Sequence, residues 1–143
     1  MTALTLEAAN KMIETGLAHA RDQKMNPMGI VVLDARGALK AASLEDNTSL
    51  IRWRIAFAKA YGALGMGSGT RKLAALAAER PAFINAATHL AEMGLVPVAG
   101  GVLIKTAQGE IIGAVGVSGD TSDNDEIVGV KGIEAAGFVA DGG

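Results

Sequence analysis

Acidic residues gather directly after an apolar run near the C-terminal end of the sequence. The stretch GAVGVSGDTSDNDE covers residues 113–126, and Asp120, Asp123, Asp125 and Glu126 follow its last glycine. A phosphate-binding P-loop carries a lysine and a positive field, and both are missing here. The spacing D-T-S-D-N-D-E does not match a calcium loop either. The pattern is typical of a helix N-terminus, where Ser, Asp and Asn cap free N–H groups and acids offset the helix dipole. One of these carboxylates, if it faced a pocket, could still bind a cation or accept a proton.

Basic and aromatic residues share the segment RWRIAFAKA. Arg52 and Lys59 are seven residues apart, so a helix places them on one face, beside Trp53 and Phe57. A carboxylate ligand could meet that face. The alternatives are a solvated helix face and a simple ion pair between Lys59 and Asp46.

Two histidines are present, and neutral imidazole is a common ligand of haem iron. His19 lies late in a predicted helix, where it is either a ligand or a residue on the wet face. His89 lies among alanines and is expected on the surface or at an interface. Tyr61 and Met66 either line an apolar pocket or pack in the core. No nucleophile–base set, dinucleotide fingerprint or closed zinc site is indicated.

The composition excludes several classes of protein. The 143 residues are half apolar, with 3% aromatic residues, a net charge of −2 and no cysteine. Disulfides and thiol chemistry are therefore excluded, and the basic footprint of a nucleic-acid-binding protein is missing. No apolar run reaches membrane-spanning length, and the N-terminal residues do not resemble a secretion signal. We expect a cytoplasmic protein of one domain, residues 1–143, whose scarcity of large core side chains favours oligomerisation.

Helices and strands alternate in a consistent order along the chain. Apolar spacing predicts helices over residues 5–24 with Thr5 as N-cap, 50–64 capped within 46–49, 70–79, 81–93, and from Ser122 or Asp123 to about 138. Strands are predicted over residues 29–34, 38–44, 96–106 and 111–119, and Gly109 suits the last hairpin turn. The glycines of GAVGVSG suit a strand that packed helices cross closely, or a close approach to a ligand. Tight turns imply antiparallel pairing, so the fold class is α+β, one antiparallel sheet with helices packed on it.

Three stretches together resemble the GlcG/HbpS family, which includes haem-binding proteins and the C-terminal domain of PduO-type proteins. They are GIVVLDARG, IAFAKAYGAL and VPVAGGVLIKTAQGEIIGAVGVSGDTSDNDE, and the likeness runs from about residue 6 to 137. The resemblance implies a profilin-like antiparallel sheet flanked by helices. It also implies homo-oligomers built from dimers, up to octamers, and haem or a related tetrapyrrole as ligand.

The resemblance also points to individual positions. It implies a haem-ligating histidine near His19, and it matches Asp34, Asp46 and Lys59 to family positions. It further matches Gly119, Asp125 and Glu126 to the terminal loop of the family. Together with Arg52, the cofactor-binding candidates are His19, Asp46, Arg52, Lys59, Gly119, Asp125 and Glu126, with no metal site beyond haem iron.

The chain departs from the family pattern at two places. Ala38 replaces a histidine that many members carry after the turn glycine, and Leu44 replaces the arginine of an R-x-D-G-A segment, in which Asn47 and Thr48 also differ. A site of the family type would therefore lose a base, the histidine, and an anion-binding group, the arginine. An alternative function is therefore a small catabolic enzyme or accessory subunit that transfers protons through Asp34, Asp46, Lys59 or Glu126, and a third is a purely structural assembly module.

Overall fold

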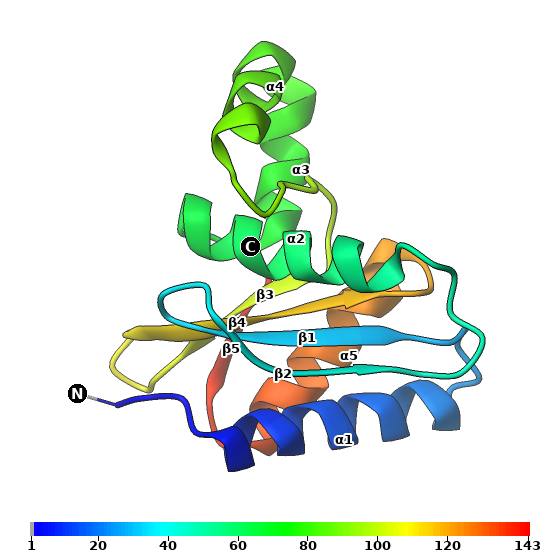
Figure 1. Cartoon of the computed structure of the whole chain (residues 1–143). Helices are drawn as coiled ribbons and strands as arrows, with labels where there is room; N and C mark the ends of the chain where they lie inside the picture. Colours follow the sequence, from blue (N-terminus) through cyan, green and yellow to red (C-terminus); the bar gives the residue numbers. More distant parts are fainter. Residues whose placement is uncertain (1) are drawn as a thin grey trace.

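A computed structural model describes residues 2–143, and within that range it contains five helices and five strands (Figure 1). The helices are α1 (Leu6–Asp22), α2 (Arg52–Met66), α3 (Thr70–Glu79), α4 (Pro81–Leu90) and α5 (Ser122–Ala135). The strands are β1 (Gly29–Asp34), β2 (Leu39–Leu44), β3 (Gly101–Lys105), β4 (Ile111–Ser118) and β5 (Val139–Asp141). The strands form one antiparallel sheet in the order β2-β1-β4-β3-β5. Helices α1 and α5 cover one face and α2 covers the other (Figure 1), which confirms the α+β prediction.

The inner strands are buried on both faces, which explains why they read as continuous apolar runs. Side chains alternate along β1, so Ile30 and Val32 enter the core beneath α1 and α5, while Val31 and Leu33 enter the core beneath α2. The hydroxyl of Thr5 accepts the N–H of Ala8 and begins α1, as the sequence predicted.

Helix α2 lies on the sheet at main-chain distance because two glycines face it. Gly101 of β3 and Gly116 of β4 are partners in the antiparallel register. A Cβ at Gly101 would overlap the carbonyl oxygen of Lys59, and one at Gly116 would overlap that of Ala56. The prediction that a helix closely crosses the glycines of β4 is therefore confirmed.

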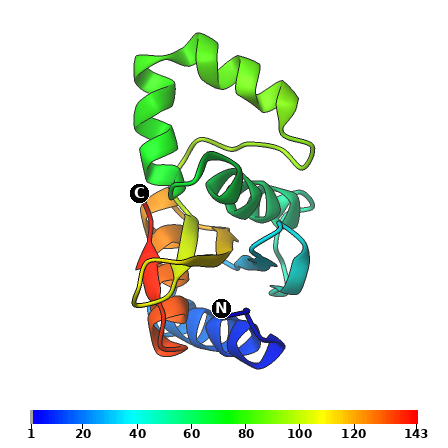
Figure 2. The same ribbon diagram turned by 90° about the vertical axis from the view of Figure 1, so that its left-hand side faces the viewer.

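Helices α3 and α4 project from the body as an arm above α2 (Figures 1 and 2). Gly67 ends α2 in the left-handed conformation, with φ of 72°, which lets the chain turn into the arm. The arm has a small core of its own, formed by Leu73, Ile84 and Leu95. At its base the hydroxyl of Thr70 accepts the N–H of Gly101 and so joins the arm to the sheet.

Two predicted helix starts are wrong. Residues 46–49 do not cap α2, since the helix begins at Arg52 and no side chain caps it. The stretch is an exposed loop in which Asn47 has φ of 70°, a left-handed conformation that a continuing helix excludes. The cap of α5 is Thr121, whose hydroxyl accepts the N–H of Asn124, and neither Ser122 nor Asp123 takes this place.

The remaining differences concern element ends. Strand β3 begins at Gly101 and not at residue 96, because residues 96–100 form the loop that returns from the arm. Helix α4 ends at Leu90, and α5 ends at Ala135 because Gly137 adopts φ of 88°. Strand β5 pairs with β3 and has no counterpart in the prediction.

Candidate functional site

A buried ion pair links α2, β4 and the first turn of α5. The Lys59 Nζ donates to Oδ2 of Asp125 at 2.9 Å and to the carbonyl of Val117 at 2.9 Å. The other carboxylate oxygen of Asp125 accepts the N–H of Asp120 at 3.0 Å. The side chains of Lys59 and Asp125 are only 3% and 2% exposed. The proposed partner of Lys59, Asp46, is therefore wrong: the lysine binds Asp125.

Burial dominates the protonation equilibria of this pair. It lowers the pKa of the Lys59 ammonium, although the Asp125 carboxylate opposes that shift. It raises the pKa of the Asp125 carboxyl, and the lysine opposes that shift in turn. Because both groups are buried and fully engaged with protein partners, neither faces a space that a ligand could enter.

Arg52 and Lys59 do share a side of α2, as their spacing predicted. The Arg52 guanidinium donates to the hydroxyl of Ser118 at 3.1 Å and to that of Ser49 at 3.2 Å. Ser118 follows Val117, so both basic groups meet the C-terminal end of β4. Their partners are protein atoms of the same chain.

The acids after β4 make local and inter-helix contacts. Asp120 accepts the N–H of Asn26 at 2.9 Å and the side-chain amide of Asn124 at 2.7 Å. The hydrogen bond from Asn26 is the main reason that the pKa of Asp120 is lowered. Asp123 and Glu126 both accept from the guanidinium of Arg71, so they hold α3 against α5.

Gly119 lies directly after β4 and allows the contacts of the acids that follow it. A Cβ there would overlap the carbonyl oxygen of Pro27 and crowd Met28. Gly119 therefore brings the loop after β4 against the segment before β1. This close approach is between two parts of the chain, and it accounts for the glycine without a ligand.

Asp34 lies away from the buried pair. Partial burial raises the pKa of Asp34, but hydrogen bonds from the N–H groups of Arg36 and Ala38 outweigh it and leave the pKa below its ordinary value. Asp34 ends β1, and the other end of β1, Gly29, pairs with Ser118. At about 3.3 Å per residue the two ends are about 17 Å apart. Asp46 is exposed in the loop after β2.

The two histidines occupy opposite parts of the molecule. His19 is half-buried on α1, and its ring has no hydrogen-bond partner among residues 2–143. The sheet separates α1 from α2, so His19 does not lie with Arg52 and Lys59 (Figure 1). His89 is exposed on α4, as the sequence predicted. Within residues 2–143 no group of three or more His, Asp or Glu side chains is placed to hold a metal ion.

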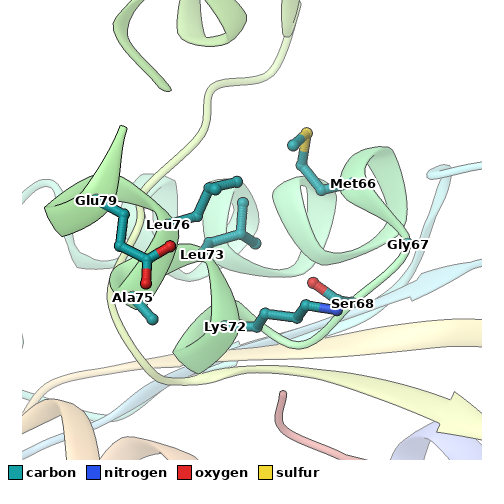
Figure 3. A pocket seen from close by; sticks show the side chains of 8 residues that line it. All are labelled: Met66, Gly67, Ser68, Lys72, Leu73, Ala75, Leu76 and Glu79. Carbon is teal, nitrogen blue, oxygen red and sulfur yellow. The ribbon is translucent and has the colours of Figure 1, made fainter. Parts of the chain in front are cut away.

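Two hollows lie at the arm, away from the acids after β4. One, of about 380 Å³, lies between α2 and α4 and is lined by Tyr61 and Met66 together with Phe83, Leu90 and Leu95. Tyr61 and Met66 line this hollow and also pack against hydrophobic clusters of the core, so both alternatives hold. A second, of about 340 Å³, lies between the end of α2 and α3, where Lys72 and Ser68 flank an apolar wall (Figure 3). The contribution of α3 and α4 to these walls was not predicted, although the apolar spacing of α4 indicates an apolar face.

A third hollow lies at the edge of the sheet on the α2 side. It measures about 350 Å³ and is lined by Leu39, Leu44, Trp53 and Phe57. None of the three hollows is lined by His19 or by any of the acids discussed above.

No helix in the described part of the chain has the length and apolar character needed to cross a bilayer.

Comparisons with known proteins point in one direction. The family model described as haem degrading protein HbpS-like matches residues 4–134. No curated protein sequence is significantly similar to the chain. Among solved structures, a PduOC:heme complex is 22% identical, with a TM-score of 0.85 over 96% of this chain and 97% of that one. A double mutant of Streptomyces reticuli HbpS is 27% identical, with a TM-score of 0.82 over 96% and 89%. The Klebsiella pneumoniae protein ORFY, of the DUF336 family, is 21% identical, with a TM-score of 0.85 over 95% and 92%.

Proposed function

The chain belongs to the HbpS-like family, described as haem-degrading proteins, and on that basis we propose that it binds haem or a related tetrapyrrole. The family match over residues 4–134 is the observation that carries the proposal. The haem named for the PduOC complex, a protein of the same fold, is consistent with it.

His19 is the residue of this chain best suited to hold haem iron. Its imidazole is half-buried, which leaves it open on one side, and no hydrogen bond from residues 2–143 engages its ring. Imidazole nitrogen is a common axial ligand, and an unengaged ring breaks no hydrogen bond to the protein when it binds iron. The other cofactor candidates support the proposal less, since Lys59 and Asp125 are buried against each other.

The three hollows described above do not include His19. Ligand pockets usually bury most of the ligand's surface, so a tetrapyrrole at this histidine needs a further cover. We therefore propose that a second copy covers the exposed face of the bound tetrapyrrole, in a homo-oligomer built from dimers. Haem, when bound, supplies the redox and ligand-binding chemistry of its iron, while the chain supplies the ligand and the cover.

The experiment is a titration of the purified protein with hemin, followed through the Soret band. We expect saturable binding, and we expect His19→Ala to weaken it at least about tenfold, a loss of 1.4 kcal/mol or more. His89→Ala is the matched control, because it removes an exposed imidazole from another helix. Equal effects of the two substitutions, or binding that never saturates, would show that hemin only adheres to the surface. Sedimentation with and without hemin tests the assembly, which we expect to contain at least two copies.

Proton-transfer catalysis by Asp34, Asp46, Lys59 and Glu126 has less in its favour. Within one chain the four groups do not share a site: Asp34 lies in a hairpin, Asp46 in a loop, Lys59 in the core and Glu126 against Arg71. We therefore do not extend the proposal to a reaction performed by these residues.

A further inference from the structure

We propose that the hollow between α2 and α4 is a second binding site, which takes a neutral aromatic molecule of about two fused rings. The site lies on the α2 side of the sheet, away from His19, and the proposal stands independently of haem binding. Its residues come from three segments of the same chain, α2, α4 and the loop that follows α4. The arm arches over α2 and places these segments opposite one another (Figure 2).

The walls of this hollow are apolar, and although Met66, Ala87 and Leu95 pack in the arm cluster, part of the apolar surface stays uncovered. Phe83 and Leu90 contribute from α4, and both remain substantially exposed, at 42% and 86%. Met66 contributes from α2, and Leu95 from the returning loop. Aromatic rings and a thioether make favourable contacts with a flat aromatic ligand. Covering these side chains with a ligand would remove their apolar surface from water.

Small residues keep the hollow open. A Cβ added at Gly65 would meet no other atom within 4 Å, so the missing side chain leaves space that nothing else fills. On the opposite wall, α4 presents Ala86, Ala87 and Ala91. Large residues at these places would close the gap between the two helices.

The volume sets the size of the occupant. An apolar cavity of about 150 Å³ accommodates benzene, and drug-sized ligands occupy pockets of roughly 300–1,000 Å³. At about 380 Å³, the hollow fits a molecule of two rings better than a single ring or a macrocycle.

The charge of the lining sets the chemistry of the occupant. No charged side chain lines the hollow, and the hydroxyl of Tyr61 is the one polar side-chain group in its walls. The nearby Arg80 guanidinium instead stacks on Phe83, 5.1 Å from the ring centre. A charged ligand would lose its hydration without compensation, whereas a neutral ring system with one hydrogen-bonding group matches the site.

Fluorescence titration with N-phenyl-1-naphthylamine, a neutral two-ring probe, tests the proposal on the full chain. We expect saturable enhancement with one site per copy. Gly65→Leu places a side chain into the open space, and we expect it to weaken binding at least about tenfold. Ala86→Leu fills the hollow from the opposite wall at an exposed position, so it repeats the test should the first variant fold poorly. The melting temperature of each variant shows whether its fold is intact.

The control substitution is Ala78→Leu, which adds the same side chain to an exposed position of α3 outside the hollow. We expect it to leave the probe's affinity within twofold, and we expect the same of His19→Ala, which separates this site from the haem proposal. Two results would overturn the inference. One is an affinity that folded Gly65→Leu and Ala86→Leu proteins both retain. The other is wild-type protein without saturable binding, as expected if a second copy of the chain plugs the hollow.

Discussion

Breaking the ion pair between Lys59 and Asp125 should destabilise the protein more than any other single change of charge in the body of the fold. The substitution Lys59→Met keeps an unbranched apolar side chain of similar length and removes the ammonium. It leaves the Asp125 carboxylate, whose side chain is 2% exposed, with one remaining donor, the N–H of Asp120. Removing one partner of a buried pair costs about 3–5 kcal/mol, because the other charge stays in the core uncompensated.

The same reasoning predicts that the two single substitutions are not additive. Asp125→Asn retains an oxygen that can accept the N–H of Asp120, but it leaves the Lys59 ammonium without a counter-charge, at a cost of about 3 kcal/mol. The double variant Lys59→Met/Asp125→Asn buries no charge, so we expect it to cost less than Lys59→Met alone. The coupling between the two sites should therefore be at least about 3 kcal/mol in magnitude.

Urea unfolding at pH 7, followed by circular dichroism at one fixed protein concentration, measures these differences. A loss of 3–5 kcal/mol corresponds to a fall in melting temperature of about 12–20 °C for a chain of this size. Lys105→Met is the matched control, since it breaks a pair with Asp141 at 2.6 Å in which the side chains are 27% and 35% exposed. We expect that control to cost less than about 1 kcal/mol. Additive single substitutions, or a loss at Lys59 no greater than that at Lys105, would refute the claim that burial makes this pair important.

Three further outcomes are expected. Asp120→Ala should cost about 1.5–3 kcal/mol at neutral pH, because it removes the acceptor of Asn26 and of Asn124. The folded pKa of Asp120 lies below the unfolded value of 3.8. Its contribution to stability is therefore present above that pH and is lost as pH falls through the folded pKa. Urea unfolding at pH 3 should then show a smaller stability difference between variant and wild type than at pH 7. Gly116→Ala should push α2 off the sheet and reduce stability by several kcal/mol, seen as a lower melting temperature or insoluble protein, since its Cβ would overlap a carbonyl of α2. Thr121→Ala should remove the cap of α5 and cost about 1 kcal/mol by urea unfolding, whereas Thr121→Ser should cost little.

The parts of the fold that the sequence predicted well are those specified by neighbouring residues. The runs GIVVLD and IIGAVGVSG are buried on both faces, and glycine turns bound the hairpins that contain them. Apolar runs and turn residues therefore both predict these strands. The failures lie where distant contacts decide. Strand β5 has only three residues and exists because it pairs with β3. The polar run 46–49 has the composition of a cap, yet a left-handed Asn47 keeps it outside the helix.

In the candidate site, too, contacts between neighbouring residues were predicted and contacts between distant residues were not. Spacing correctly placed Arg52 and Lys59 on one side of a helix, because helical periodicity is local. One alternative paired Lys59 with Asp46, which is close in sequence, whereas the partner in the structure is 66 residues away. No pattern of neighbouring residues predicts that the loop after β4 folds back. This fold places Asp125 in the core, while Asp123 and Glu126 bind Arg71. Likewise, the opposing walls of the arm hollow are set by how α4 stands over α2, which the periodicity of either helix leaves open.

The two glycines beneath α2 restrict movement of this helix relative to the sheet. Because the backbone of α2 lies directly on the backbone of the sheet at these two glycines, the helix has little room to slide or tilt, and the buried lysine fixes it further. Beyond Gly67 the chain no longer lies on these two glycines. We expect any adjustment to a molecule between α2 and α4 to fall on α4 and the loop after it, because Thr70 and Arg71 tie the start of α3 to the sheet and to α5.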